Sequence, residues 1–136
     1  LETTMTFQVE LVSPEGIAYS GEAEMVIART VGGGEIAFQP GHVPFIGVLA
    51  VWSVDVIHSD GGRDTLAVHR GFVQVAGTMV TILSDVSEAA DEIDVDRARA
   101  AREVAEVALA ADRDDAAAAE ALARADVRLA VANAEA

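Results

Sequence analysis

The apolar residues of this chain change their spacing once, close to residue 90, and that change limits the folds open to it. From Thr6 to about Ser87, apolar and polar residues alternate, which is the pattern of half-buried strands. Beyond Asp91 there is no glycine or proline, alanine dominates, and apolar residues recur with a helical period. The sequence therefore predicts a segregated α+β protein, in which an N-terminal antiparallel β-sandwich is followed by a C-terminal antiparallel hairpin of two helices.

Turn residues separate the predicted strands of the first half. A first strand has Phe7, Val9 and Leu11 on one face, and the segment SPEG at residues 13–16 ends it. The other predicted strands are residues 22–30, 35–39, 52–59, 64–70, 72–75 and 79–84. We interpret the glycines at 32–34 as a turn that needs positive φ, and DGG at 60–62 as a hairpin turn. Many short strands joined in this way are typical of a sandwich or barrel.

The second half contains two predicted helices, separated by DRDD at residues 112–115, whose aspartates are suited to cap the second helix. The predicted inner faces consist of Val104, Ala108 and Ala111 on the first helix and Ala118, Leu122, Ala125, Leu129 and Ala132 on the second. Alanine contacts bury little area, so the two helices stabilise each other weakly and owe much of their helicity to propensity. We therefore expect the helical half to be a moving part.

These patterns divide the chain into residues 5–90, the sandwich, and residues 91–136, the hairpin. We expect Met5 to be the native start and residues 1–4 to be a leader left over from cloning. The N-terminal segment lacks a basic stretch followed by an apolar run, so no secretory signal is predicted. The longest apolar stretch, residues 43–57, contains Pro44 and Asp55 and is too short to span a bilayer, so we expect a soluble protein.

The net charge of −14 argues against nucleic acid and anionic lipid as general partners, because both require a basic surface. All of the positive charge comes from arginine, since the chain has no lysine. The absence of cysteine excludes disulfides, a thiolate nucleophile and a cysteine zinc site, and fits a reducing compartment.

A catalytic or metal site built on His42, His58 and His69 is an alternative that the spacing does not favour. No histidine pair has the i,i+4 spacing of a helix, and no G-x-S-x-G or P-loop motif is present. His58 and His69 flank a predicted hairpin, where two strands come close in any case. We therefore interpret the three histidines as surface or strand-edge residues and predict neither a catalytic residue nor a metal ligand.

A second candidate cluster contains arginines of the helical half. Arg97, Arg124 and Arg128 would converge if the hairpin folds back, and their guanidinium groups would suit phosphate oxygens. The alternative is ordinary surface pairing, of Arg99 with Glu103 or of Arg102 with Glu106. Spacing alone favours the surface pairs.

The order of the motifs resembles the epsilon subunit of the bacterial F-type ATP synthase from Met5 onwards. MTFQVELVSPEGIAYSGEAEMV is similar to the first strands of that family, and GEIAFQPGHVPFIGVL to its G-x-x-x-x-P-G-H-x-P-L signature, with Phe45 and Ile46 where leucine is usual. HRGFVQVAGTMVTILSD resembles the strand pair that closes the sandwich, and IDVDRARAAR the start of the first C-terminal helix.

The resemblance implies a non-catalytic rotor subunit that binds the gamma subunit in the central stalk, on the cytoplasmic side of the bacterial plasma membrane. It reaches the membrane only through the complex. A loop that contacts the polar loops of the c-ring would contain Glu35, Pro40, Gly41, His42 and Pro44. The prolines restrict φ and Gly41 allows the chain to turn, so the loop is expected to be stiff.

The resemblance also implies that the hairpin regulates ATP hydrolysis, by lying on the sandwich or by extending to the alpha and beta subunits. No cofactor is required, but ATP is a candidate regulatory ligand of the folded-back state. The residues that match the family's ATP site are Ile93, Asp94, Arg97 and Ala98, then Glu88, and finally Arg124 and Arg128 as phosphate contacts. A further arginine of the family aligns with Val104 here, which makes phosphate binding less secure than adenine binding.

Residues 111–136 carry more carboxylates than arginines, whereas a helix that docks on acidic catalytic subunits should be basic. We therefore expect weak inhibition, or inhibition through Val127, Leu129 and Val131. Two other functions stay open at this point: a module that senses ATP by itself, and a small histidine-based hydrolase.

Overall fold

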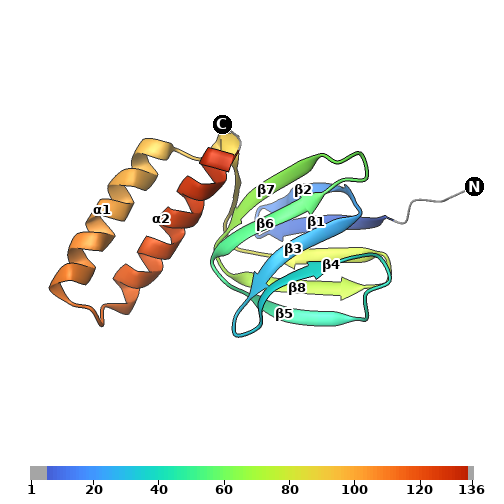
Figure 1. Ribbon diagram of the computed structural model, residues 1–136, viewed down its shortest axis with the longest axis horizontal. Helices are drawn as coiled ribbons and strands as arrows, with labels where there is room; N and C mark the ends of the chain where they lie inside the picture. Colours follow the sequence, from blue (N-terminus) through green and yellow to red (C-terminus); the bar gives the residue numbers. More distant parts are fainter. Residues whose placement is uncertain (1–5, 135–136) are drawn as a thin grey trace, which may run out of the picture.

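The computed structural model describes residues 6–134, which form a β-sandwich followed by two helices (Figure 1). The predicted fold class is therefore confirmed. The predictions about Met5 and the leader at residues 1–4 lie outside the described residues.

The strands of the sandwich are β1 (Phe7–Ser13), β2 (Gly16–Ala23), β3 (Met25–Thr30), β4 (Gly34–Phe38), β5 (Phe45–Leu49), β6 (Trp52–Ile57), β7 (Arg63–Val68), β8 (Gly71–Ala76), β9 (Met79–Leu83) and β10 (Ser87–Ala89). A 3-10 turn, η1 (Ala90–Glu92), leads to α1 (Val95–Ala111) and α2 (Ala116–Ala134).

The strands form one hydrogen-bonded path in the order β10-β7-β6-β3-β5-β8-β9-β1-β2, and β4 pairs with β3. Every ladder is antiparallel except that between β1 and β9, which is parallel. The sheet encloses one core, whose largest fully buried side chains include Phe38, Leu11, Leu49 and Ile82. The pairing of β1 with β9 joins the first and the second-to-last strand of the sandwich, which single-strand patterns do not reveal.

The strand predictions need four corrections. Residues 22–30 are not one strand, because β2 ends at Ala23 and β3 begins at Met25. Most of β2 was not predicted, because its exposed residues on both faces show no alternation. The same holds for β5, in which Gly47 interrupts the pattern, and for β10, which has only three residues.

The turn predictions are confirmed. Gly32 and Gly34 have φ values of 79° and 72°, in the left-handed region that glycine tolerates best. Gly61, with φ 92°, lies in the hairpin between β6 and β7, where Ile57 pairs with Arg63.

The cap of the second helix is also as predicted, since the Asp115 carboxylate accepts a hydrogen bond of 3.0 Å from the Ala118 amide. The inner face of α2 is confirmed: Ala118, Ala125 and Leu129 are buried, and Leu122 and Ala132 are half-buried.

The predicted inner face of α1 is wrong for two of its three residues. Ala108 is half-buried, but Val104 is 71% exposed and Ala111 is exposed, whereas Ala98 and Ala105 are buried. The larger apolar residues of α1, Val104, Val107 and Leu109, point in different directions around the helix, so they do not define one face that must pack. Packing of α1 on α2 buries Ala98 and Ala105 instead.

The hairpin lies beside one end of the sandwich, with α2 on the inner side and α1 on the outer side (Figure 1). Helix α2 contacts β6, β7, β10 and η1. A small apolar cluster at this contact contains Ala67, Ile93, Val127 and Val131. Because α1 packs mainly on α2, the position of the whole hairpin depends on what α2 contacts.

Candidate functional site

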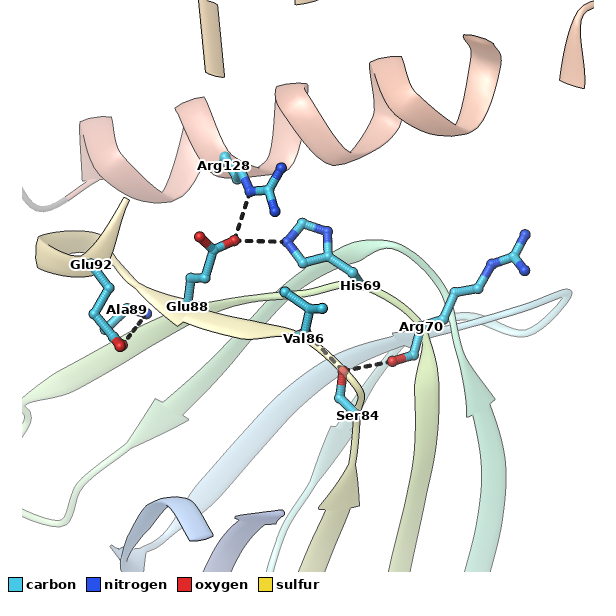
Figure 2. Close-up of polar contacts among 8 residues, drawn as sticks. All are labelled: His69, Arg70, Ser84, Val86, Glu88, Ala89, Glu92 and Arg128. Carbon is cyan, nitrogen blue, oxygen red and sulfur yellow. Dashed lines mark hydrogen bonds and ion pairs between the residues drawn. The ribbon is translucent and has the colours of Figure 1, made fainter. Parts of the chain in front are cut away.

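Three polar residues meet where α2 lies against the sandwich, and we refer to His69, Glu88 and Arg128 as the junction cluster (Figure 2). His69 follows β7 directly and Glu88 is in β10, which pairs with β7. The Glu88 Oε1 atom lies 3.1 Å from His69 Nε2 and 2.6 Å from Arg128 Nε. One carboxylate oxygen of the sandwich therefore accepts hydrogen bonds from both the sandwich and the hairpin.

The environment determines the charges of the junction cluster. Burial lowers the pKa of His69, and the nearby charges of Arg128 and Arg124 add to this effect. Burial opposes ionisation of Glu88, but the hydrogen bonds from Arg128 and His69 outweigh it and leave the pKa of Glu88 below its usual value. We therefore assign a carboxylate to Glu88 and a neutral imidazole to His69. Neutral His69 donates from Nε2, and its buried Nδ1 has no partner among the described residues.

A second polar contact lies next to the junction cluster. Arg70 Nη2 is 3.2 Å from Glu120 Oε2, and Arg124 Nη1 is 3.3 Å from Glu120 Oε1 within α2. The Arg70 side chain is 68% exposed, so solvent screens this pair strongly. The pair therefore helps to orient α2 on the sandwich and contributes little to the free energy of the contact.

A pocket of about 280 Å³ opens beside the junction cluster, and most of the residues predicted to bind ATP line it. Its lining consists of Glu88, Glu92, Asp94, Arg97, Ala98, Ala101 and Arg128. Arg97 and Arg128 do converge here, whereas Arg124 pairs with Glu120 and does not line the pocket. Ile93 is buried in the apolar cluster with Val127.

The pocket is a poor site for a polyphosphate in this state. Its volume of 280 Å³ is just below the range of about 300–1,000 Å³ that is usual for small-molecule sites. Three carboxylates line it against two guanidinium groups. Moreover, Asp94 is the N-cap of α1 and accepts a hydrogen bond of 3.1 Å from the Arg97 amide, which gives it a structural role.

The predicted surface pairs are present in part. Arg102 Nε lies 3.4 Å from Glu106 Oε1, as expected for i,i+4 neighbours. Arg99 pairs with Asp96, at 3.8 Å, and not with Glu103. Arg97 thus belongs to the pocket, while the arginines that follow it in α1 form surface pairs.

The loop predicted to contact the c-ring follows β4. Gly41 has φ 89°, and the His42 amide donates to the Gln39 carbonyl at 3.0 Å, so the chain turns where the sequence predicted. The His42 ring packs edge-on against Phe38, with 5.1 Å between ring centroids. Glu35 lies at the opposite end of β4, so the structure does not bring Glu35 and His42 together.

An exposed apolar row on β5, β8 and β9 was missed by the sequence analysis. Val48 lies opposite Phe72, and Phe72 lies opposite Leu83. Their exposed fractions are 49%, 53% and 46%. The row borders a mostly apolar groove of about 600 Å³ that Val12 and Pro14 also line. The alternation in β8, with Val73 and Val75 buried, could have revealed the outward side of Phe72 from sequence, but β5 was not predicted as a strand.

The three histidines do not form one site. His58 directly follows β6, at the turn of the β6–β7 hairpin, His69 directly follows β7, at the open end of that hairpin, and His42 lies in the loop after β4. His58 Nε2 is 2.8 Å from Asp64 Oδ2, and this hydrogen bond raises the pKa of His58. Among residues 6–134, no group of three or more His, Cys, Asp or Glu side chains is arranged to hold a metal ion.

Comparison with known proteins gives consistent results. Residues 6–90 match the family model for the β-sandwich domain of the ATP synthase delta/epsilon chain. The ATP synthase epsilon chain of Streptomyces griseus subsp. griseus is 46% identical over 121 residues, which cover 89% of this chain and 90% of the relative. The epsilon chain of Shouchella clausii is 41% identical over 128 residues, or 93% and 95% of the two chains.

A solved structure has the same architecture. In the cryo-EM structure of the Euglena gracilis mitochondrial ATP synthase, with OSCP, F1 and the c-ring, one chain is similar to this one with a TM-score of 0.71 and 21% identity. The likeness covers 95% of this chain and 78% of that chain. At this identity it shows the fold.

Proposed function

Because the chain belongs to the family of ATP synthase epsilon chains, we propose that it is a non-catalytic rotor subunit of a proton-translocating ATP synthase. It couples the catalytic head to the c-ring and regulates ATP hydrolysis through its hairpin. The alignment with epsilon chains over nine-tenths of both sequences is the observation on which this proposal rests. It acts on the cytoplasmic side of a bacterial plasma membrane and reaches that membrane through the complex. Within residues 6–134, neither helix has the length and apolar character needed to cross a bilayer.

The row of Val48, Phe72 and Leu83 is the surface that we assign to the gamma subunit. Three large apolar side chains on neighbouring strands, with an apolar groove beside them, are unusual on a free surface and typical of a protein contact. The surface lies on strands of the sandwich, so it stays available whether the hairpin is docked or extended.

Co-purification with tagged gamma subunit tests this assignment. Phe72→Glu should abolish the complex, because it places a charge at the centre of the apolar row. Val104→Glu is the matched control, since Val104 is 71% exposed on α1, outside the sandwich. If the unchanged chain fails to bind gamma, the proposed function is wrong.

The loop after β4 is the surface that we assign to the c-ring. Its turn is defined by Gly41 and the packing of His42 on Phe38, and Val43 at its tip is 71% exposed. Glu35 extends the contact to the other end of β4. The double variant Glu35→Ala, His42→Ala should weaken attachment to the ring and coupled proton pumping, and unchanged coupling would contradict the assignment.

We assign regulation to the hairpin, with ATP as a ligand of the docked state in the pocket that Arg97 and Arg128 line. The excess of carboxylates in that pocket supports low affinity. Val127 and Val131 are buried in the docked state, so they can contact the catalytic subunits only after α2 leaves the sandwich. Titration of the full chain with ATP by calorimetry tests the first assignment. Removal of residues 91–136 should raise ATP hydrolysis only slightly, and a large rise would contradict weak inhibition.

A further inference from the structure

We propose that protonated His58 is a pH-sensitive clasp, which ties β2 to the β6–β7 hairpin, closes an open side of the sandwich and loosens as the pH rises. The proposal concerns the sandwich alone. It goes beyond the proposed rotor function and does not depend on any partner of the chain.

The sandwich has an open side because its hydrogen-bonded path does not close into a barrel. The path ends in β10 on one side and in β2 on the other, and among residues 6–134 no ladder joins β2 to β7 or β10. We call the gap between β2 and these two strands the seam. A pocket of about 360 Å³ occupies it, and its lining includes Tyr19 of β2, Asp64 and Leu66 of β7 and Ala89 of β10. Side chains must therefore close this side of the sandwich.

Three side chains bridge the seam where β2 and β7 lie close together (Figure 1). The Tyr19 hydroxyl of β2 donates to Asp64 Oδ2 of β7 at 2.7 Å. His58 Nε2 lies 2.8 Å from the same oxygen. His58 Nδ1 lies 2.9 Å from the Glu22 carbonyl oxygen of β2. One imidazole thus contacts both sides of the seam.

The two contacts of His58 determine the charge of its ring. A carbonyl oxygen and a carboxylate oxygen are both acceptors, whereas a neutral imidazole has only one N–H. In a neutral ring, either Nδ1 would direct its lone pair at the Glu22 carbonyl, or Nε2 would direct its lone pair at Asp64. Only the imidazolium donates to both acceptors. The closed seam therefore requires a positive charge on His58.

The carboxylates around His58 favour the same charge. Asp64 is its partner on β7, Asp60 lies in the β6–β7 turn, and Glu22 and Glu24 add negative charge at the end of β2. The hydrogen bond to Asp64, then that to the Glu22 carbonyl, and further the charges of Asp64 and Asp60 raise the pKa of His58 above 6.5. Partial burial opposes the charge but does not outweigh these contacts.

The other groups at the seam do not change charge near neutral pH. Hydrogen bonds from Tyr19 and His58 lower the pKa of Asp64, which is therefore a carboxylate. Burial and then the hydrogen bond to Asp64 raise the pKa of Tyr19, so its hydroxyl stays a donor. Arg63, the neighbour of Asp64 in β7, lies 3.7 Å from Asp55 Oδ2. His58 is thus the group whose protonation decides whether the seam is held.

Deprotonation removes one of the two contacts of His58, because the neutral ring keeps a single N–H. The Glu22 carbonyl and Asp64 then compete for that donor, and the seam opens more often. Strand β2 keeps its ladder with β1, so it stays in the sheet and the opening is local. The Glu24 amide reports on the opening, since it donates to the Ile57 carbonyl at 2.9 Å, next to His58 in the chain.

The charge of the ring can be measured directly on the full chain by NMR of the imidazole nitrogens. An unperturbed histidine is half protonated at pH 6.5, whereas His58 should be mostly imidazolium there. Asp64→Asn should shift the midpoint of its titration down by about one pH unit, or tenfold in proton affinity, because the carboxylate partner is lost. Asp85→Asn is the matched control, since it removes an exposed carboxylate from the loop after β9.

Amide hydrogen exchange of Glu24 between about pH 6 and pH 9 tests the clasp. Protection factors, which are already corrected for base catalysis, should fall about tenfold in the unchanged chain as His58 loses its proton. His58→Gln should show the low protection at every pH. His58→Lys should keep the high protection throughout, because its ammonium group stays charged and can donate to Asp64. Amides of β1 that pair with β9 are the internal reference.

Three results would overturn the proposal: a neutral His58 ring at pH 6.5, a titration that Asp64→Asn leaves in place, or Glu24 protection that is independent of pH in the unchanged chain. Loss of protection in His58→Lys would overturn it as well, because a fixed charge would then fail to replace the imidazolium. None of these readouts involves gamma, which uses the row of Val48, Phe72 and Leu83. A failed co-purification would therefore count against the proposed function alone, and these results against the clasp alone.

Discussion

The sandwich and the hairpin are both stabilised by apolar contacts, but they use side chains of very different size. Phe38, Leu11 and Ile82 are fully buried in the sandwich, whereas the buried residues between α1 and α2 are mainly alanines such as Ala105 and Ala125. At roughly 25 cal/mol per Å² of buried apolar area, an alanine contact contributes far less than a phenylalanine or leucine contact. The sandwich is thus the stable body, and the position of the hairpin is the adjustable property.

The contact between the two bodies differs from both interiors. It combines a small apolar cluster around Val131 with the ionic hydrogen bonds of Glu88. Such a contact is specific in geometry, because donors and acceptors must match, but modest in free energy. This combination suits an element that must dock in one orientation and still be released.

The largest expected effect is in the core of the sandwich. Phe38→Ala should lower the free energy of unfolding by about 3–5 kcal/mol, because it removes a side chain with 0% exposure and leaves a cavity. Urea denaturation followed by tryptophan fluorescence measures this, since Trp52 is the only tryptophan in the chain.

Leu122→Ala is the matched change in the hairpin. Leu122 is only half-buried, so its loss should cost less than half as much as the loss of Phe38 and should leave the transition seen by Trp52 almost unchanged. Equal effects of the two substitutions would show that the hairpin and the sandwich unfold as one unit. That result would contradict the view that the sandwich is the stable body and the hairpin is held by weaker contacts.

A smaller effect is expected at the start of α2. Asp115→Ala removes the side chain that accepts the Ala118 amide hydrogen bond, and loss of such a cap typically costs about 1 kcal/mol. Amide hydrogen exchange should become faster in the first turn of α2 and stay unchanged in β1. Asp114→Ala, one position earlier and exposed, is the control. Equal acceleration by both variants would mean that charge near the helix, and not the cap, stabilises this turn.

Local chemistry made part of this structure predictable from the sequence. The change of period separated sandwich from hairpin, glycines marked the turns at Gly32 and Gly61, and aspartate marked the cap of α2. The face of α1 was not predictable, because alanine and valine occupy every side and long-range packing decides among them. The exposed row with Phe72 and Leu83 likewise requires the register of three strands, which no single strand contains.

The candidate site shows the same limit. Arg97 and Arg128 line one pocket in the structure. From the sequence, their convergence is one of two interpretations, and spacing alone favours the other, in which the arginines form surface ion pairs. The pair of Glu88 with His69 depends on β10, a three-residue strand without a recognisable pattern. Polar contacts between segments far apart in the sequence depend on tertiary packing, which a motif does not encode.

The smallest expected effect is a difference in pH response between His69, at the junction, and His58, at the other end of the β6–β7 hairpin. Hydrogen bonds to Asp64 and to the Glu22 carbonyl raise the pKa of His58 above 6.5, so the folded state holds its proton more tightly than the unfolded state. That stabilisation is complete below pH 6.5 and is lost as pH rises through the folded-state pKa. Burial lowers the pKa of His69 below 6.5, so its contribution is complete above pH 6.5 and is lost as pH falls.

Unfolding free energies measured between pH 5 and 9 should therefore separate the two residues. His58→Gln should remove part of the decline above pH 6.5, and His69→Gln part of the decline below it, since 6.5 is the usual pKa of both. Because His69 contacts Glu88 and through it α2, only His69→Gln should also change the pH dependence of the distance across the junction, measured between spin labels at Ala18→Cys in β2 and Ala119→Cys in α2. If His58→Gln altered that distance as much, the two ends of the β6–β7 hairpin would be coupled, and the junction could not be regarded as a local contact between a stable sandwich and a separable hairpin.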